Sequence, residues 1–423
     1  MRKPEILAPA GNMESLETAC LYGADAVYLG VRGPFNLRAR AKNFTLEELE
    51  MAVGFAHSKG VKIYLTLNTF PRERQLQEIE HIISGARDIG VDAFIISDLG
   101  IFMLARRLAP RIPIHISTQS NTVNSASANA WAELGAQRII LARELNHKEI
   151  AKIRAKTNTE LEIFVHGSIC ISISGRCLIS NYLAERDANQ GFCAQPCRWE
   201  YALVEKSKPK EYMPVLEKDG FTYLYNSKDL CLLPVMDRVM RLSIDGLKIE
   251  GRSKTALYVA TTVSTYKKAR DVWLEDPGAF KVDKSWMEEL SKISNRDYFT
   301  GFFEREPSID GVAYDLNGYI QEYHLAAKVL GTEGGITIFE ARNPLVEGMK
   351  MEWLPSDSGY RSFILKDPMV DGEKARYIKP NQVFTMKTPF RPKRGELVRK
   401  PYSEGDRMEQ KEEDSARGQG LAG

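Results

Sequence analysis

Short runs rich in β-branched residues alternate with segments of helical period through the first 270 residues of this 423-residue chain. Each strand-like run ends at a small or polar residue, which is typical of repeated βα units. Three helix-to-strand junctions carry a glycine, at Gly23, Gly90 and Gly135, where a left-handed residue can end a helix. Eight strands with helical crossovers predict a TIM-like (β/α)8 barrel, with a doubly wound open sheet as the alternative. The strands are expected at Glu5–Ala8, Ala26–Leu29, Lys62–Thr66, Ala93–Ser97, Pro113–Ser117, Arg138–Leu141, Leu161–Val165 and Ile244–Ile249, with helices between them such as Leu46–Ser58, Gln75–Ile89 and Ala126–Leu134.

The C-terminal third has a different pattern. From Tyr319 to Arg399 the chain shows short strands separated by turns, which predicts a small β-barrel. We therefore expect a TIM-like barrel domain over residues 1–315 with a cysteine-rich insertion at about 168–231, a C-terminal β-barrel domain over 316–403, and a tail over 404–423. The tail has almost no apolar residues, so it is expected to be disordered.

Polar side chains follow the predicted strands, where the active site of such a barrel lies. Some of them are also suited to capping helices, as Asn68 and Ser97 are. Lys248 and Glu250 lie two residues apart on one strand, so they could form a structural ion pair instead of taking part in chemistry. The strand-end candidates are Asn68, Ser97, Asp98, Ser117, Thr118, Gln119, Arg143, Glu144, His166, Glu250 and Arg252.

Four of the six cysteines fall in one short polar stretch, at Cys170, Cys177, Cys193 and Cys197. Disulfides are disfavoured because no apolar signal segment follows the first residues, and we expect a cytoplasmic protein. Zinc prefers closely paired cysteines, and only the last two are so spaced. Four thiolates of irregular spacing fit an iron–sulfur cluster better, with zinc as the alternative. Cys231 follows a polar stretch and competes for a ligand position.

The net charge of +2 hides a local excess of cations. Between Lys374 and Lys400 there are nine Lys or Arg residues against one acid, Glu396, so a polyanion would bind there. The stretch 388–394 includes Phe390 and suits an RNA backbone with a stacked base, whereas a merely solvated basic edge is the alternative. No run of eighteen apolar residues occurs, so no membrane span is expected.

Six phrases of the sequence, in the same order, resemble the collagenase-like peptidase family U32. They lie at 7–11, 23–28, 117–119, 162–170, 174–177 and 247–252. Within that family, the phrase at 226–230 and the C-terminal extension are similar to the tRNA hydroxylation branch. The resemblance implies synthesis of 5-hydroxyuridine at the wobble position of tRNA, with prephenate as co-substrate. Sister branches hydroxylate ribosomal RNA or the ubiquinone ring, and the ubiquinone-related members hold a 4Fe-4S cluster.

The resemblance also implies a set of site residues. The cluster ligands would be Cys170, Cys177, Cys193 and Cys231, with Cys197 as the competing ligand. Prephenate carries two carboxylates, which guanidinium groups bind in a bidentate fork. We expect the co-substrate site to include Arg143, Arg176, Ser117 and Thr118, and the catalytic residues to be His166, Glu250, Arg252 and Gln119.

The expected partner is the anticodon loop of tRNA, whose base is already splayed from its stack. Partner subunits are common in this family, which leaves homo- and hetero-oligomers open. A U32-type peptidase activity competes with tRNA hydroxylation, although the chain lacks both His-Glu-x-x-His and Gly-x-Ser-x-Gly. Hydroxylation of ribosomal RNA or of a quinone ring also stays open, as does a non-catalytic RNA-binding protein in which a metal staples the insertion.

Overall fold

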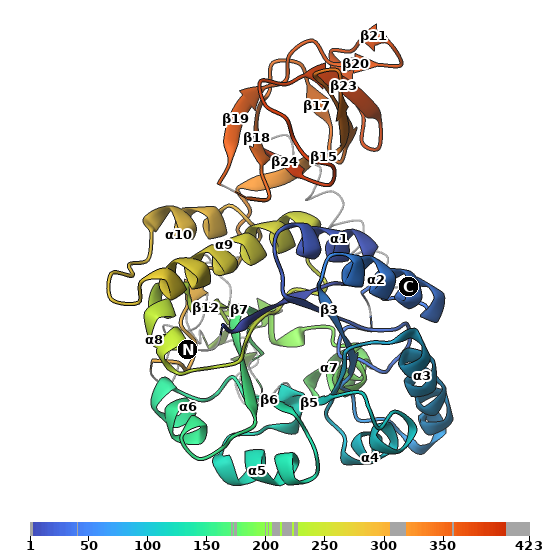
Figure 1. Cartoon of the computed structure of the whole chain (residues 1–423), viewed down its shortest axis with the longest axis vertical. Helices are drawn as coiled ribbons and strands as arrows, with labels where there is room; N and C mark the ends of the chain where they lie inside the picture. The colour runs from blue at the N-terminus through green and yellow to red at the C-terminus, as the bar shows by residue number, and fades with distance from the viewer. Residues whose placement is uncertain are drawn as a thin grey trace. The chain divides into compact units, whose positions relative to one another are not determined.

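Two compact units make up the chain in the computed structural model (Figure 1). The first comprises Met1–Met287 with Asn295–Tyr319, and the second Glu288–Ser294 with Ile320–Gly423. The structure describes residues 3–39, 41–170, 172, 176–198, 200–201, 203–204, 212–213, 222–223, 227–304, 319–357 and 359–402. The expected disordered tail at 404–423 and much of the expected insertion lie outside the described residues.

Eight parallel strands close into a barrel in the first unit, which confirms the predicted fold class. Closure comes from the last strand, which pairs in parallel with both the first and the seventh. Each strand lies where the sequence predicts it, and the largest difference is that the seventh extends to Ser168. The barrel strands are β1 (Glu5–Pro9), β2 (Ala26–Leu29), β3 (Lys62–Leu67), β4 (Ala93–Ile96), β5 (Ile114–Ile116), β6 (Arg138–Ile140), β7 (Glu160–Ser168) and β13 (Gly246–Ile249).

Helices surround the barrel (Figure 1), and their ends follow the local sequence. Thr45 and Glu48 form a capping box that satisfies free N–H groups at the start of α2. The predicted junction glycines Gly23, Gly90 and Gly135 all have positive φ, and Gly90 is the C-cap of α3. The helices are α1 (Met13–Leu21), α2 (Leu46–Ser58), α3 (Leu76–Ile89), α4 (Leu99–Leu108), α5 (Ser125–Glu133), α6 (His147–Arg154), α8 (Met236–Arg241) and α9 (Ala256–Glu275).

The carboxyl half of β7 carries an additional pairing outside the barrel. Strand β12 (Asp229–Cys231) runs antiparallel to it, with Cys231 opposite His166, and β14 (Tyr298–Phe299) continues the sheet. The carboxylate of Asp229 accepts a hydrogen bond of 2.5 Å from Arg296, and both side chains are buried. Cys231 therefore sits in a strand rather than in the polar turn that its sequence context suggests.

Charged side chains replace part of the apolar packing inside the barrel. Glu162 is fully buried and accepts from Lys248 at 3.0 Å and from Arg138 at 3.1 Å. Arg138 also pairs with Glu5 at 2.7 Å and with Glu160 at 2.7 Å. Lys248 thus pairs with Glu162 and not with Glu250, its neighbour on the same strand. We call Glu5, Arg138, Glu162 and Lys248 the interior charge ladder.

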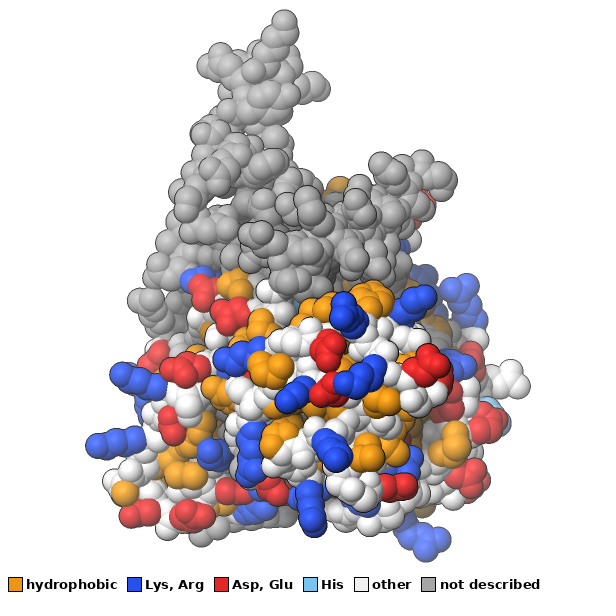
Figure 2. Space-filling model, turned by 90° about the horizontal axis from the view of Figure 1, so that it is seen from above, with side chains coloured by type: hydrophobic (Ala, Val, Ile, Leu, Met, Phe, Trp, Pro, Cys, Tyr) orange, Lys and Arg blue, Asp and Glu red, His pale blue; other side chains and the backbone are white. Residues whose placement is uncertain are grey.

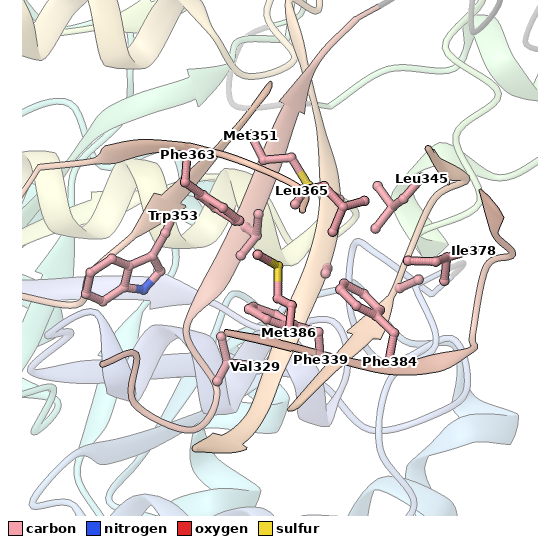
Figure 3. Close-up of a cluster of buried hydrophobic side chains, with 14 residues drawn as sticks. Val329, Phe339, Leu345, Met351, Trp353, Phe363, Leu365, Ile378, Phe384 and Met386 are labelled. Atoms are coloured by element: carbon pink, nitrogen blue, oxygen red, sulfur yellow. The ribbon is translucent and has the colours of Figure 1, made fainter. Parts of the chain in front are cut away.

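The second unit is an antiparallel half-barrel sheet around its own apolar core. Side chains from β15 (Tyr323–Glu333), β16 (Ile336–Ala341), β18 (Lys350–Leu354), β19 (Arg361–Ile364) and β23 (Val383–Lys387) meet there (Figure 3). Phe339 stacks on Phe384 with ring centroids 5.1 Å apart, between strands that pair at these two residues. The predicted C-terminal β-domain is thus observed.

A buried arginine explains why residues 288–294 belong to the second unit. Arg399 on β24 (Leu397–Pro401) donates to Glu352 at 2.6 Å and to Glu289 at 2.9 Å. Lys292 lies 3.6 Å from the same Glu352 carboxylate. These ion pairs hold a short helical segment against the half-barrel. Among the described residues, no helix is long and apolar enough to cross a membrane.

Replacing Glu162 by Gln should lower the free energy of unfolding by about 3–5 kcal/mol, because the change leaves two buried cations without their shared carboxylate. Chemical denaturation followed by circular dichroism measures it. The control is Glu80→Gln, which breaks an exposed pair with Arg107 and should cost less than about 1 kcal/mol. Equal losses in the two variants would contradict a stabilising role for the ladder.

Candidate active site at the barrel mouth

A cavity of about 390 Å³ opens where the carboxyl ends of the barrel strands meet. Its walls come from both the strand ends and the cysteine-rich segment, although these are far apart in sequence. The cationic side chains that line it outnumber the acidic ones, Glu144 and Glu250. These cations are Arg38, Arg143, Arg186, Lys248, Arg252 and Lys254. The cavity is therefore suited to an anionic ligand.

Glu250 lies at the centre of the cationic wall. Its carboxylate pairs with Arg38 at 2.9 Å and lies 3.7 Å from Arg143, and Tyr28 donates to it at 3.4 Å. Burial raises the pKa of Glu250, but attraction to Arg38, Arg143 and Arg252 outweighs it and holds that pKa below the ordinary value. Glu250 is thus a fixed anion that orients two guanidinium groups, and it is poorly suited to accept a proton.

Arg252 is held by side-chain oxygens from strand β3 and from the loop after β2. Its guanidinium donates to Thr66 at 2.8 Å, to Asn43 at 2.7 Å and also to Asn36. Burial lowers its pKa to about 10. Backbone packing fixes this turn, since a Cβ on Gly11 would clash with the carbonyl oxygen of Arg252.

Arg143 lines the cavity and packs on an aromatic ring. Its guanidinium lies 3.8 Å from the centre of the Phe164 ring and donates to the carbonyl oxygen of Ser168 at 2.9 Å. Burial lowers its pKa. In the part of the chain that the structure describes, the buried Nε atoms of Arg143 and Arg252 have no hydrogen-bond partner. Both arginines line the cavity, and their unsatisfied donors are the feature that most directly points to an anionic ligand.

The predicted residues after the fifth strand also reach the cavity. Ser117, Thr118 and Gln119 all line it. Ser117 accepts from the backbone N–H of Gln119 at 3.3 Å, and Thr118 donates to the carbonyl of Leu141 at 3.2 Å. Arg176 donates to the carbonyl of Gln119 at 2.7 Å, so it braces this turn and is not itself part of the cavity wall.

Four cysteines line the same cavity, namely Cys170, Cys177, Cys193 and Cys197. None of the six cysteines, all of which the structure describes, forms a disulfide. Backbone N–H groups point at two of the sulfur atoms, with Ile179 at 3.4 Å from Cys177 Sγ and Gln195 at 3.3 Å from Cys193 Sγ. Within the described ranges, no three His, Cys, Asp or Glu side chains are close enough to hold a metal ion. The donor type fits a thiolate-bound centre, and the four sulfurs would have to draw together around it.

The structure places Cys231, the predicted fourth ligand, apart from these four. It is buried, does not line the cavity, and lies 3.6 Å from the hydroxyl of Tyr266. Burial raises the pKa of its thiol to about 11, which disfavours the thiolate that a metal needs. Cys197, the competing ligand, is the one that shares the cavity.

His166 also lies outside the cavity wall, although it was predicted as a catalytic residue. The rings of Tyr258, Tyr266 and Tyr298 surround it, with centroids 5.2–5.8 Å away. Burial lowers its pKa to about 3, so the imidazole is neutral. Its backbone carbonyl accepts from the N–H of Glu250 at 2.9 Å, which positions the strand end that carries the site.

Three residues that line the cavity, Tyr28, Arg38 and Lys248, and one that binds Arg252, Asn36, were not among the predicted site residues. Arg38 and Asn36 lie in a loop with no recognisable pattern, so nothing signalled them. Tyr28 and Lys248 were visible as polar side chains within strand runs, and a buried ionisable residue in a barrel strand is the signal that could have found them.

The basic stretch of the second unit has a different surface from that predicted. Phe390 stacks on Trp353 at 4.3 Å and packs into the apolar core, so it is not a free platform for a base. Arg391, Lys393 and Arg394 are exposed. On the described part of the face in Figure 2, Lys and Arg side chains are interspersed with Asp and Glu, so charge of one sign does not mark a binding region there.

The fold and the cavity define a barrel protein with a cationic, thiol-lined site at its mouth. The model of peptidase family U32 matches residues 11–312, and the chain belongs to this family. It is 38% identical to tRNA hydroxylation protein P1 of Bacillus subtilis (strain 168), covering 83% of each chain. It is 33% identical to tRNA hydroxylation protein P of Escherichia coli (strain K12), over 92% of this chain and 94% of that one. A protein named collagenase from Porphyromonas gingivalis is 32% identical over 71% of this chain and 73% of its own length.

Proposed function

We propose that this protein hydroxylates tRNA, converting the wobble uridine to 5-hydroxyuridine with prephenate as co-substrate and a 4Fe-4S cluster at the barrel mouth. The names of its relatives in B. subtilis and E. coli support tRNA hydroxylation. The observation that carries the finer proposal is the cavity itself, which is lined by four cysteines and by two arginines that each keep an unpartnered Nε.

A dicarboxylate fits the cationic wall of this cavity. The Nε atoms of Arg143 and Arg252 are buried donors, and a carboxylate would satisfy them with charge-assisted hydrogen bonds. Arg38 and Arg143 are held in place by Glu250, so they need little reorganisation on binding. Thr118 already donates its hydroxyl to the carbonyl of Leu141. Ser117 accepts from the backbone N–H of Gln119, so its own hydroxyl can still donate to an anion bound by Arg143 and Arg252.

The cluster would be held by Cys170, Cys177, Cys193 and Cys197. Bound there, a 4Fe-4S cluster would supply one-electron redox chemistry or a Lewis-acidic iron. The N–H groups of Ile179 and Gln195 would stabilise negative charge on two of the sulfurs. The protein residues around it would exclude water and orient the co-substrate toward a flipped base.

A peptidase activity is the alternative that the family name suggests. A cysteine peptidase needs a thiol activated by a neighbouring base, most often a histidine. None of the described residues lining the cavity is a histidine, and His166 is enclosed by tyrosines. The described part of the site therefore does not provide the pair of thiol and base that a cysteine peptidase uses to hydrolyse a peptide bond.

Substitution of single cysteines tests the cluster ligands. Cys170→Ser, Cys177→Ser, Cys193→Ser and Cys197→Ser should each lose most of the iron, acid-labile sulfide and visible absorbance of anaerobically prepared protein, because each removes a thiolate ligand. Cys231→Ser and Cys20→Ser are matched controls and should keep all three. If Cys197→Ser keeps its iron and Cys231→Ser loses it, the fourth ligand is Cys231, as the resemblance implies. Stoichiometric zinc without iron would contradict an iron–sulfur cluster.

The activity is tested by incubating the anaerobic protein with unmodified tRNA and prephenate and measuring 5-hydroxyuridine in nuclease digests by mass spectrometry. Arg143→Met keeps the packing on Phe164 but loses the charge, so the apparent KM for prephenate should rise about 10- to 100-fold. Arg107→Met, on the surface, is the control. Product that does not depend on prephenate would contradict the co-substrate, and cleavage of a collagen peptide without tRNA product would favour the peptidase.

The exposed cations of the second unit are expected to contact the tRNA backbone. The triple variant Arg391→Glu, Lys393→Glu, Arg394→Glu should weaken tRNA binding and make its salt dependence shallower, because fewer counterions are released. The same charge change on the first unit, Lys148→Glu, Lys152→Glu, Lys156→Glu, is the control. The affinity for tRNA is measured by filter binding at several salt concentrations. If both triple variants lose the same affinity, binding depends on the net charge of the protein and not on these three residues.

A further inference from the structure

Lys248 is the one member of the interior charge ladder that lines the cavity. It lies on β13, and its ammonium sits 4.5 Å from the centre of the Tyr28 ring and 5.5 Å from that of Phe164. The side chain is buried, and its carboxylate partner Glu162 is shared with Arg138. Lys248 thus lies between the cavity and the buried carboxylate of Glu162.

This environment makes the amine more reactive than that of an ordinary lysine. Burial lowers the pKa of Lys248 below 10.5, and although Glu162 opposes the shift, it does not cancel it. A lower pKa leaves more neutral amine near neutral pH, and the neutral amine is the nucleophile. Arg143 and Arg252 line the same cavity, and among the described residues the Nε of each has no hydrogen-bond partner.

We propose that Lys248 forms an imine with the carbonyl group of a 2-oxo acid whose carboxylate is held by Arg143 and Arg252. The class of ligand rests on the proposed function, because prephenate is itself a 2-oxo acid. The role of the lysine rests on its place in the cavity. The site would thus anchor its co-substrate covalently as well as by charge.

The reaction balances without any oxidant. The amine nitrogen attacks the carbonyl carbon and forms a C–N bond, the carbonyl oxygen takes up two protons and leaves as water, and a C=N bond remains. Hydrolysis reverses these steps and releases the 2-oxo acid. An ordinary lysine in water would be protonated and unreactive at the same pH.

Trapping with cyanoborohydride tests the imine directly. The reagent delivers hydride to the imine carbon, the nitrogen takes up a proton, and a stable secondary amine results. With phenylpyruvate, and separately with prephenate, the intact protein should gain the mass of the acid less one oxygen atom, and peptide mapping should place the adduct on Lys248.

Lys248→Arg keeps a cation beside Glu162 but cannot form an imine, so it should lose the adduct. Lys62 pairs with Glu5 at the other end of the ladder, so the control variant Lys62→Arg should still form the adduct on Lys248. If Lys248→Arg does not fold, mapping of the wild-type adduct still decides the matter. No adduct, or an adduct on Lys254 in place of Lys248, overturns the proposal. Prephenate-dependent tRNA hydroxylation without an adduct would refute the imine alone, whereas an adduct without hydroxylation would refute the proposed function alone.

Discussion

Closure of the parallel barrel by β13 is the constraint on which the site depends. The strand pairs with β1 on one side and β7 on the other, so its carboxyl end meets those of the other strands. Lys248, Glu250 and Arg252 lie on or directly after this single strand, and all three line the cavity. An open sheet would leave these residues at an edge, whereas the closed barrel surrounds them with groups from the other strand ends.

The barrel also buries charged side chains, which it pairs with carboxylates. Glu162 compensates Lys248 and Arg138 in the interior, and Glu250 compensates Arg38 and Arg143 at the mouth. At the mouth one carboxylate serves two cations, so a net positive charge remains there, whereas Arg138 in the interior also pairs with Glu5 and Glu160. Burying these charges costs desolvation energy, and the excess of cations at the mouth suits an anionic ligand.

Much of the site could be predicted because strand-end position follows from strand order. Once the eight strands were recognised, Ser117, Arg143, Glu250 and their neighbours had to lie at one face of the barrel. Arg38 could not be found in this way, since it reaches Glu250 from a loop without periodicity. The partner of Lys248 was also mistaken, because sequence spacing favours the neighbour on the same strand, whereas the actual partner, Glu162, comes from β7 alongside it.

Hydrophobic period, junction glycines and residue spacing are local properties, so the barrel, the C-terminal β-domain and the grouping of cysteines could be predicted from the sequence. Which of Cys197 and Cys231 lines the cavity follows from the tertiary structure. Pairing of β12 with β7 buries Cys231 against Tyr266, while Cys197 lines the same cavity as the other three cysteines. That distinction depends on strand pairing between distant segments, and no spacing of cysteines along the chain encodes it.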